Sequence, residues 1–237
     1  MKPYQTVPIR ECGEALVPIP LAHFAVCTPH PYAVLGAPYG DRSPYFLRIG
    51  VLARLKQAQA FLQKSHPGWH LQIFDAYRPI SVQQFMVDYT FNQLVTREAL
   101  DLATLNEAER SHFKSQVAEF WAVPSLNPKT PPPHSTGAAI DLTLVNADDR
   151  PVEMGSAIDE ISSRSYPNHF KGSDQPSEQR YHAHRSLLSE VMQIAGFHQH
   201  PNEWWHFSAG DQLWAWQSGN GAIARYGNAE FATNLVF

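Results

Sequence analysis

Two histidines and an aspartate are spaced in a way that suits a catalytic zinc ion. His134 and Asp141 bracket the beginning of an expected strand, and His206 follows Asp141 by about 65 residues. Two imidazoles and a carboxylate are a common set of three protein ligands for catalytic zinc, with a fourth position left for water. Magnesium and calcium prefer oxygen ligands, so the set favours zinc. We expect one zinc ion per chain, with Gly137 allowing the backbone to turn between the first two ligands.

Two more side chains could complete the chemistry around that ion. Glu203 lies three residues before His206 and could act as a general base toward water and then protonate a leaving amine. Arg78, at the end of an expected strand, could stabilise an oxyanion or bind a substrate carboxylate. Taken singly, each of these residues is more often structural, and the chain has 12 histidines. Only their combination predicts a hydrolase.

The composition excludes several other classes of protein. The chain has 237 residues, 43% hydrophobic and 17% charged, which suits a folded domain with a sizeable core and not a disordered chain. The formal net charge is -4, so nucleic acid is not an expected partner. Prolines and charges interrupt residues 1–21, and no apolar run reaches the roughly 18 residues of a membrane span. We therefore expect a cytoplasmic protein with no membrane segment.

Two further patterns carry less weight. Residues 219–224 fit a loose G-x-G-x-x-A pattern, but they lie too near the C-terminus for a dinucleotide-binding unit to follow. Cys27 with His30 nearby is weak support for a thiol nucleophile, because such a thiol needs an oriented base. Two cysteines also exclude a disulfide scaffold and a cysteine-type zinc finger.

The hydrophobic pattern predicts helices and strands that are interspersed along the chain. We expect helices over 46–64, 81–95, 107–121 and 177–195, with Ser81 and Asn106 as N-caps of the second and third. We expect strands over 70–74, 138–145 and 197–200, with residues 203–207 closing the fold. Residues 1–45 are expected as extended segments and loops, 124–133 as a stiff proline-rich loop, and 146–176 as a polar loop.

These elements predict the α+β class. Few β-α-β units occur, which favours a largely antiparallel sheet flanked by helices, with the zinc site at a face of the sheet. No repeat or domain boundary is visible, so residues 1–237 are expected to form a single domain. The pattern assigns no role to the tail from about 212 to 237.

Four short motifs follow one another in order across about residues 40–210. They read YRP at 77–79, HSTGAAID at 134–141, MGSAID at 154–159 and EWWHF at 203–207. In this order and spacing the chain resembles the zinc D-alanyl-D-alanine dipeptidases of the vancomycin-resistance type, within the wider D-Ala-D-Ala metallopeptidase group. The resemblance implies hydrolysis of D-alanyl-D-alanine or a related small dipeptide. It also implies zinc ligands at three positions: His134, Asp141 and His206.

The resemblance implies roles for three more residues. Glu203 would be the catalytic base, Arg78 would stabilise the transition state, and Asp159 would bind the free ammonium group of the substrate. The chain departs from the family at Pro132, where a small polar residue helps hold the substrate amine, and at Ile158, which replaces a phenylalanine. These departures bear on the preference for a free dipeptide and leave the metal chemistry intact.

Two alternatives stay open. The first is a D,D- or L,D-carboxypeptidase that trims peptidoglycan stem peptides on the same zinc scaffold. The second is a catalytically silent module that binds zinc or a partner. The presence of Glu203 argues against the silent module, because a scaffold that has lost catalysis should also lose the base.

Overall fold

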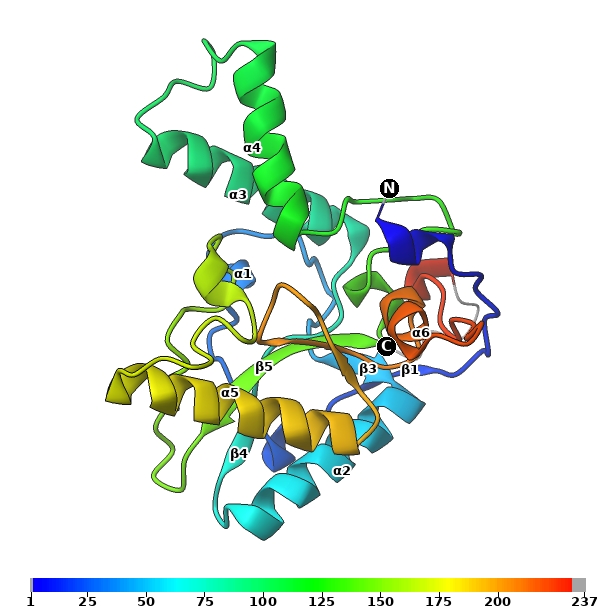
Figure 1. Ribbon diagram of the computed structural model, residues 1–237. Helices are drawn as coiled ribbons and strands as arrows, with labels where there is room; N and C mark the ends of the chain where they lie inside the picture. The colour runs from blue at the N-terminus through cyan, green and yellow to red at the C-terminus, as the bar shows by residue number, and fades with distance from the viewer. Residues whose placement is uncertain (1, 232–237) are drawn as a thin grey trace.

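A five-stranded sheet lies at the centre of the protein (Figure 1). The structure is a computed structural model that describes residues 2–231. The strand order is β2-β4-β5-β7-β6. Of the paired strands, only β2 and β4 run parallel, and the other neighbours are antiparallel. The expected α+β class with a largely antiparallel sheet is confirmed. The strands are β2 (Ala25–Val26), β4 (His70–Asp75), β5 (Ala139–Val145), β6 (His198–Gln199) and β7 (His206–Ser208).

Helices α2 (Ile49–Ser65) and α5 (Pro176–Ile194) lie against one face of this sheet and contact each other (Figure 1). Their apolar stripes meet alternate residues of the strands in one buried cluster. Leu55 and Leu188 contribute from the two helices, and Ile140, Leu142 and Leu144 contribute from β5. The main core therefore lies between the sheet and this pair of helices.

Strand alternation places the polar candidates on the opposite face of the sheet. Successive side chains of a strand point to opposite faces. Because Ile140 and Leu142 belong to the core, Asp141 between them points away from it. Phe207 of β7 belongs to the same core, so His206 also points away. The expected site at a sheet face follows from this period of two.

A helical pair on the other side of the molecule has its own small core. Helices α3 (Ile80–Arg97) and α4 (Glu107–Phe120) project from the rest of the protein at the top of Figure 1. The Asn106 side chain accepts from the Glu109 N–H at 2.9 Å, and the Glu109 carboxylate accepts from the Asn106 N–H at 2.9 Å. The expected Asn106 cap is confirmed. The expected Ser81 cap is wrong, because α3 begins at Ile80 after Pro79 and has no side-chain cap.

Other element boundaries also differ from expectation. The helix expected from residue 46 begins at Ile49, because residues 46–48 form strand β3 (Phe46–Arg48), which pairs with β1 (Leu16–Pro18). Leu47 is fully buried in that pairing, so tertiary contact outweighs the helical pattern. Residues 124–133 are loop, as expected. Residues 146–175 are mostly loop, with the short 3-10 turn Ser163–Ser165 and an isolated β-bridge from Pro151 to Val145, and α5 begins one residue earlier than expected, at Pro176.

Part of the expected tail is an ordered segment that holds the N-terminal residues. Helix α6 (Gln212–Ser218) is capped by Asp211, which accepts from the Trp214 N–H at 2.8 Å. The amide of Gln212 donates to the Val7 carbonyl at 2.7 Å, and Ile9 forms an isolated parallel β-bridge with Ala224. Residues 232–237 of the tail lie outside the described part of the chain.

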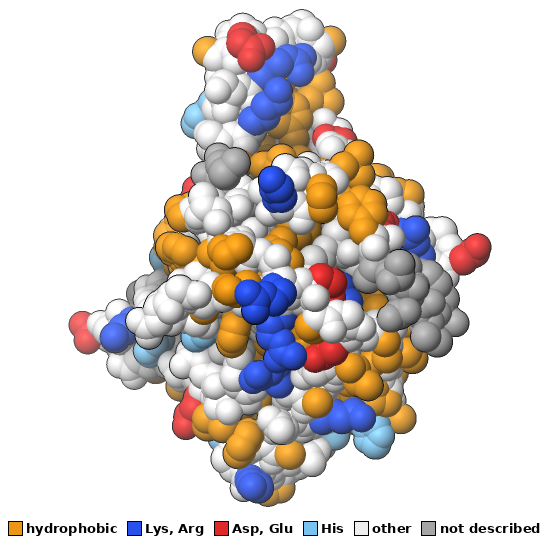
Figure 2. All heavy atoms as spheres, turned by 90° about the vertical axis from the view of Figure 1, so that its right-hand side faces the viewer, with side chains coloured by type: hydrophobic (Ala, Val, Ile, Leu, Met, Phe, Trp, Pro, Cys, Tyr) orange, Lys and Arg blue, Asp and Glu red, His pale blue; other side chains and the backbone are white. Residues whose placement is uncertain are grey.

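Helix α6 and the N-terminal residues that it holds lie on the side of the molecule that faces the viewer in Figure 2. On this face basic side chains gather near the centre with acidic and apolar ones beside them, so the charge is mixed. Cys12 and Cys27 are free thiols, and burial raises the pKa of Cys27, which disfavours the thiolate that a nucleophile requires. Among the helices described, none is long and apolar enough to cross a membrane.

Candidate metal centre

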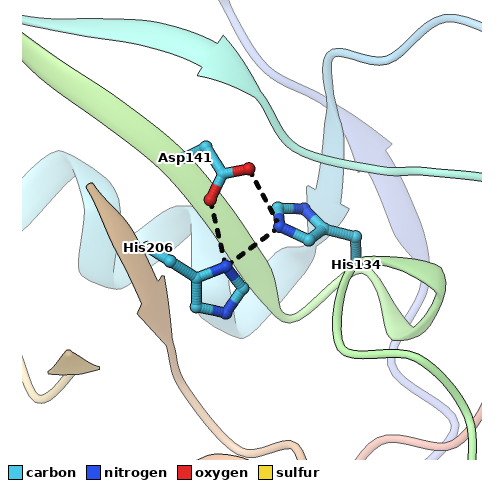
Figure 3. A group of neighbouring side chains, drawn as sticks. All are labelled: His134, Asp141 and His206. Atoms are coloured by element: carbon cyan, nitrogen blue, oxygen red, sulfur yellow. Dashed lines mark hydrogen bonds and ion pairs between the residues drawn. The ribbon is translucent and has the colours of Figure 1, made fainter. Parts of the chain in front are cut away.

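Three side chains converge on one point between β5, β7 and the turn before β5 (Figure 3). His134 comes from the 3-10 turn His134–Thr136, and Asp141 and His206 are directly opposite each other in the β5–β7 ladder. His134 Nε2 lies 3.1 Å from His206 Nδ1 and 3.1 Å from Asp141 Oδ2. His206 Nδ1 lies 3.0 Å from Asp141 Oδ1. All three residues are buried.

These separations fit a tetrahedral metal ion. Donor atoms at zinc's usual bond lengths of about 2.1 Å lie about 3.4 Å apart at the corners of a tetrahedron. His134 Nε2 lies within a few tenths of an ångström of that spacing from both His206 Nδ1 and Asp141 Oδ2, and His206 Nδ1 lies equally close to the other carboxylate oxygen, Asp141 Oδ1. They form a buried group that can hold a metal ion.

His134 is oriented by a hydrogen bond on its far side. Its Nδ1 lies 2.7 Å from the carbonyl oxygen of Ala76 and must carry the hydrogen there, because the carbonyl can only accept. Nε2 is then left with a lone pair that points at the metal position. The turn ends at Gly137, whose φ is +71°, and an added Cβ there would overlap the Leu16 side chain. The expected turning role of Gly137 is confirmed.

His206 is oriented through a hydroxyl. Its Nε2 lies 3.3 Å from Ser208 Oγ, and the Ser208 hydroxyl donates to Asp211 Oδ2 at 2.8 Å. Because Ser208 uses its hydrogen toward Asp211, its oxygen accepts from the Nε2–H of His206. This leaves Nδ1 of His206 with the lone pair that could bind a metal ion. Each imidazole thus has a second partner that fixes its tautomer, as metal-binding histidines usually do.

Arg78 lies buried beside the triad. Its guanidinium donates from Nε to Asp75 Oδ2 at 2.9 Å and from Nη1 to Gln83 Oε1 at 2.9 Å. Nη2 lies 3.2 Å from Asp141 Oδ2 and 3.3 Å from the Tyr32 hydroxyl. These bonds hold one edge of the guanidinium toward the group formed by His134, Asp141 and His206. An arginine in this position can donate to a negatively charged oxygen of a bound substrate.

Asp75 belongs to the site although the sequence reading did not select it. A register shift in the β4–β5 ladder between Ile73 and Asp75 accompanies the departure of Asp75 from the apolar face. Its Oδ1 accepts from the Tyr39 hydroxyl at 3.0 Å and lies 3.1 Å from His30 Nε2. Burial alone would raise the pKa of Asp75, but Arg78 and His30 outweigh it and lower the pKa. The sequence does contain a signal that could have identified Asp75: it is an acidic residue at the end of a strand, three residues before Arg78.

Glu203 faces the triad from the loop before β7. Its Oε2 lies 3.7 Å from His206 Nδ1, and its Oε1 lies 3.5 Å from His200 Nδ1. Burial, and next the charge of Asp141, raise the pKa of Glu203 well above its usual value. A raised pKa makes its carboxylate a stronger base.

His200 is a second site residue that the sequence reading missed. It is buried, and its ring centroid lies 5.5 Å from that of His206. Burial, and next His206, lower the pKa of His200 well below its usual value, which favours the neutral ring. No motif distinguishes it from the other histidines of the chain, so only the structure identifies it.

Asp159 lies at another side of the same pocket. Its backbone is left-handed, with φ +64°, and its Oδ2 accepts from the Tyr32 hydroxyl at 2.8 Å. Burial, and next the charge of Asp141, raise the pKa of Asp159 to about 7. All six residues selected from the sequence line this one pocket: Arg78, His134, Asp141, Asp159, Glu203 and His206.

A family model and relatives in sequence agree on one family. Residues 26–223 match the Peptidase M15 family, described as D-ala-D-ala dipeptidase. A D-alanyl-D-alanine dipeptidase of Synechocystis sp. is 49% identical over 241 residues, which cover 97% of this chain and 98% of the relative. The Escherichia coli enzyme of the same name is 42% identical over 74 residues, 31% of this chain and 36% of the relative. A solved vancomycin-resistance D,D-pentapeptidase in complex with Zn(II) aligns with TM-score 0.37 and 16% identity over 69% of this chain and 72% of that one.

Proposed function

Because the chain belongs to the Peptidase M15 family of D-ala-D-ala dipeptidases, we propose that it hydrolyses D-alanyl-D-alanine at a single zinc ion. His134 Nε2, the Asp141 carboxylate and His206 Nδ1 would hold that ion. The observation that carries the proposal is the donor set, with separations of 3.0 to 3.1 Å between buried atoms and a second partner for each imidazole. Imidazole with carboxylate suits zinc better than magnesium or calcium.

The side chains of the pocket divide the reaction between them. Zinc, when bound, supplies Lewis acidity that eases loss of a proton from water and polarises the scissile carbonyl. The Glu203 carboxylate takes the proton of the attacking water and returns it to the leaving nitrogen as the C–N bond breaks. Nη2 of Arg78 is placed to donate to the oxyanion that forms on the carbonyl oxygen.

The carboxylate of Asp159 favours a free dipeptide, which has an ammonium group, over an N-acylated stem peptide, which has none. Its carboxylate accepts from Tyr32 and lines the pocket, where it can pair with a substrate ammonium. An N-acylated peptide has no ammonium, so its binding would leave this carboxylate desolvated without a cation. This observation favours the dipeptidase over the D,D- or L,D-carboxypeptidase alternative.

Metal quantification and a substrate panel test the proposal. We expect about one zinc per chain after dialysis, and faster turnover of D-Ala-D-Ala than of L,D- or L,L-dipeptides or of N-acetyl-D-Ala-D-Ala. Glu203→Gln should lower kcat by roughly 100- to 10,000-fold and keep the zinc, since it removes the base and no ligand. A protein with neither metal nor dipeptide turnover refutes the proposal, and equal turnover of the N-acetyl peptide favours the carboxypeptidase.

The cytoplasmic location expected from the sequence stays a prediction. Fractionation of cells that produce the protein tests it, with activity toward D-Ala-D-Ala measured in each fraction. Activity mainly in the cytosolic fraction is the expected outcome. Activity outside the cell membrane would contradict it and would place the enzyme beside the peptidoglycan.

A further inference from the structure

The N-terminal segment forms one wall of the catalytic pocket. Lys2 and Tyr4 line the pocket together with Glu203, although no motif of the chain includes them. Tyr4 lies in the 3-10 turn Pro3–Thr6 and is buried, and the backbone N–H of Lys2 donates to Gln5 Oε1 at 2.9 Å. The backbone from which the Lys2 side chain extends is therefore held in place.

This wall is held in place from the other end of the chain. The Gln212 amide donates to the carbonyls of Val7 at 2.7 Å and Lys129 at 3.0 Å, which ties the segment to α6 and to the proline-rich loop. The Arg10 N–H donates to the Ala224 carbonyl at 2.8 Å. Hydrogen bonds to α6 and to Ala224 thus fix the position of the N-terminal segment at the pocket, and α6 is itself bonded to the proline-rich loop.

The pocket is lined by two cationic side chains, Lys2 and Arg78, which differ in how many partners they already have. Arg78 already donates to Asp75, Gln83, Tyr32 and Asp141. Lys2 forms no ion pair within the described part of the chain, although the charges of Glu203 and Glu119 act on it. Arg78 is thus held beside His134 and Asp141 by its own carboxylate partners, whereas Lys2 is available to pair with a charged group at an end of the substrate.

The chemistry of the reaction fixes where such a group must lie. In a dipeptide the leaving nitrogen belongs to the C-terminal residue, and its carboxylate is two bonds away from that nitrogen. Glu203 protonates the nitrogen in the proposed reaction, so the carboxylate must come close to Glu203. Lys2 lines the same pocket as Glu203, near enough for their charges to interact, whereas Asp159, next to Tyr32, receives the ammonium end.

We propose that Lys2 binds the free C-terminal carboxylate of the substrate, so that the pocket recognises both charged ends of a dipeptide. The inference rests on the proposed dipeptidase function and adds the residue that selects at the leaving end. A peptide with an amide or a further residue at its C-terminus lacks the charge that pairs with Lys2. It binds more weakly, because charged partners make the stronger hydrogen bonds.

Hydrolysis of D-Ala-D-Ala and of its C-terminal amide by wild-type and Lys2→Gln protein tests this inference. We expect wild-type kcat/KM to favour the free acid by roughly 10- to 100-fold, the range typical of a charge-assisted hydrogen bond. Lys2→Gln should lose most of this preference through a higher KM for the acid, with little change for the amide. Lys2→Arg should restore much of it, because the charge returns.

Lys56→Gln on the exposed face of α2 is the matched control and should behave as wild type. Zinc content should be the same in all four proteins, since Lys2 is not a ligand. If Lys2→Gln keeps the wild-type preference for the acid, or loses activity equally on both substrates, the inference is wrong while the dipeptidase function stands. If the wild-type protein hydrolyses neither substrate, the function itself fails, and the inference fails with it.

Discussion

The guanidinium of Arg78 donates from Nε to Oδ2 of Asp75 at 2.9 Å, and the same Oδ2 lies 3.7 Å from Nδ1 of His134. One fully buried carboxylate therefore contacts both the proposed oxyanion donor and a proposed metal ligand. The other oxygen of Asp75, Oδ1, accepts a hydrogen bond from the Tyr39 hydroxyl. The two functional groups are positioned by one residue that is not a proposed metal ligand and does not line the pocket.

Replacement of that carboxylate should weaken both stability and turnover. In Asp75→Asn the buried Arg78 loses one of its two carboxylate partners, so we expect the free energy of unfolding to fall by about 3 kcal/mol. We expect kcat to fall by at least about tenfold, since the guanidinium is no longer fixed. Urea unfolding and steady-state kinetics measure the two effects. Asp88→Asn, an exposed position on α3, is the control, and equal behaviour of the two variants would contradict the prediction.

Metal affinity should depend on Ser208. In Ser208→Ala the Nε2–H of His206 loses its acceptor, so the tautomer with Nδ1 free for the metal is no longer favoured. We expect zinc affinity to fall by about 10- to 100-fold, as is usual when such an outer partner is removed. Competition with a chelator measures the affinity, and Ser186→Ala at an exposed position of α5 should leave it unchanged. Unaltered affinity in Ser208→Ala would rule out the hydroxyl as the orienting group.

The pH dependence of catalysis should reflect Asp159. Burial, and next Asp141, raise the pKa of this carboxyl to about 7, so it is neutral below that pH and charged above it. Only the charged form pairs with an ammonium, so kcat/KM for D-Ala-D-Ala should fall as the pH drops through about 7. Asp159→Asn should have a low kcat/KM at pH 8 and should lack this fall. If the variant keeps the same acid limb, another group causes it.

The turn between the first two ligands should not tolerate a side chain. Gly137→Ala places a Cβ at φ +71° and against Leu16, so we expect the free energy of unfolding to fall by about 2 kcal/mol or more. Gly172→Ala is a matched control, because Gly172 has φ +80° and open space around it. That variant should lose only about 1 kcal/mol, from backbone strain. Equal losses in the two variants would mean that the Leu16 contact does not matter.

The residues proposed to meet the substrate and metal could be selected from sequence because their types and order suit that chemistry. Glu203 and His206 lie within one short motif, and His134 and Asp141 lie within another. Strand alternation then requires the two strand residues to leave the apolar face. No comparable signal exists for His200 or Ser208, whose roles depend on contacts that form only when the chain folds.

Errors in the predicted elements have a similar origin. Residues 46–48 continue the helical pattern of the residues after them, but Leu47 gains more from pairing with Val17 in a strand. At the start of α3 the fixed φ of Pro79 replaces a capping side chain, so Ser81 lies inside the helix and leaves it uncapped. In both cases a local preference competes with an interaction that the local sequence does not contain.

The contacts between the two chain ends also set an order of events during synthesis. The last proposed ligand, His206, precedes Gln212 and Ala224, which hold the residues around Val7 and Ile9. Since Gln212 and Ala224 follow His206 in the chain, the N-terminal wall is secured only after every proposed ligand has been made. A chain without residues 212–224 would keep every proposed ligand and lose the bonds that hold the wall beside them.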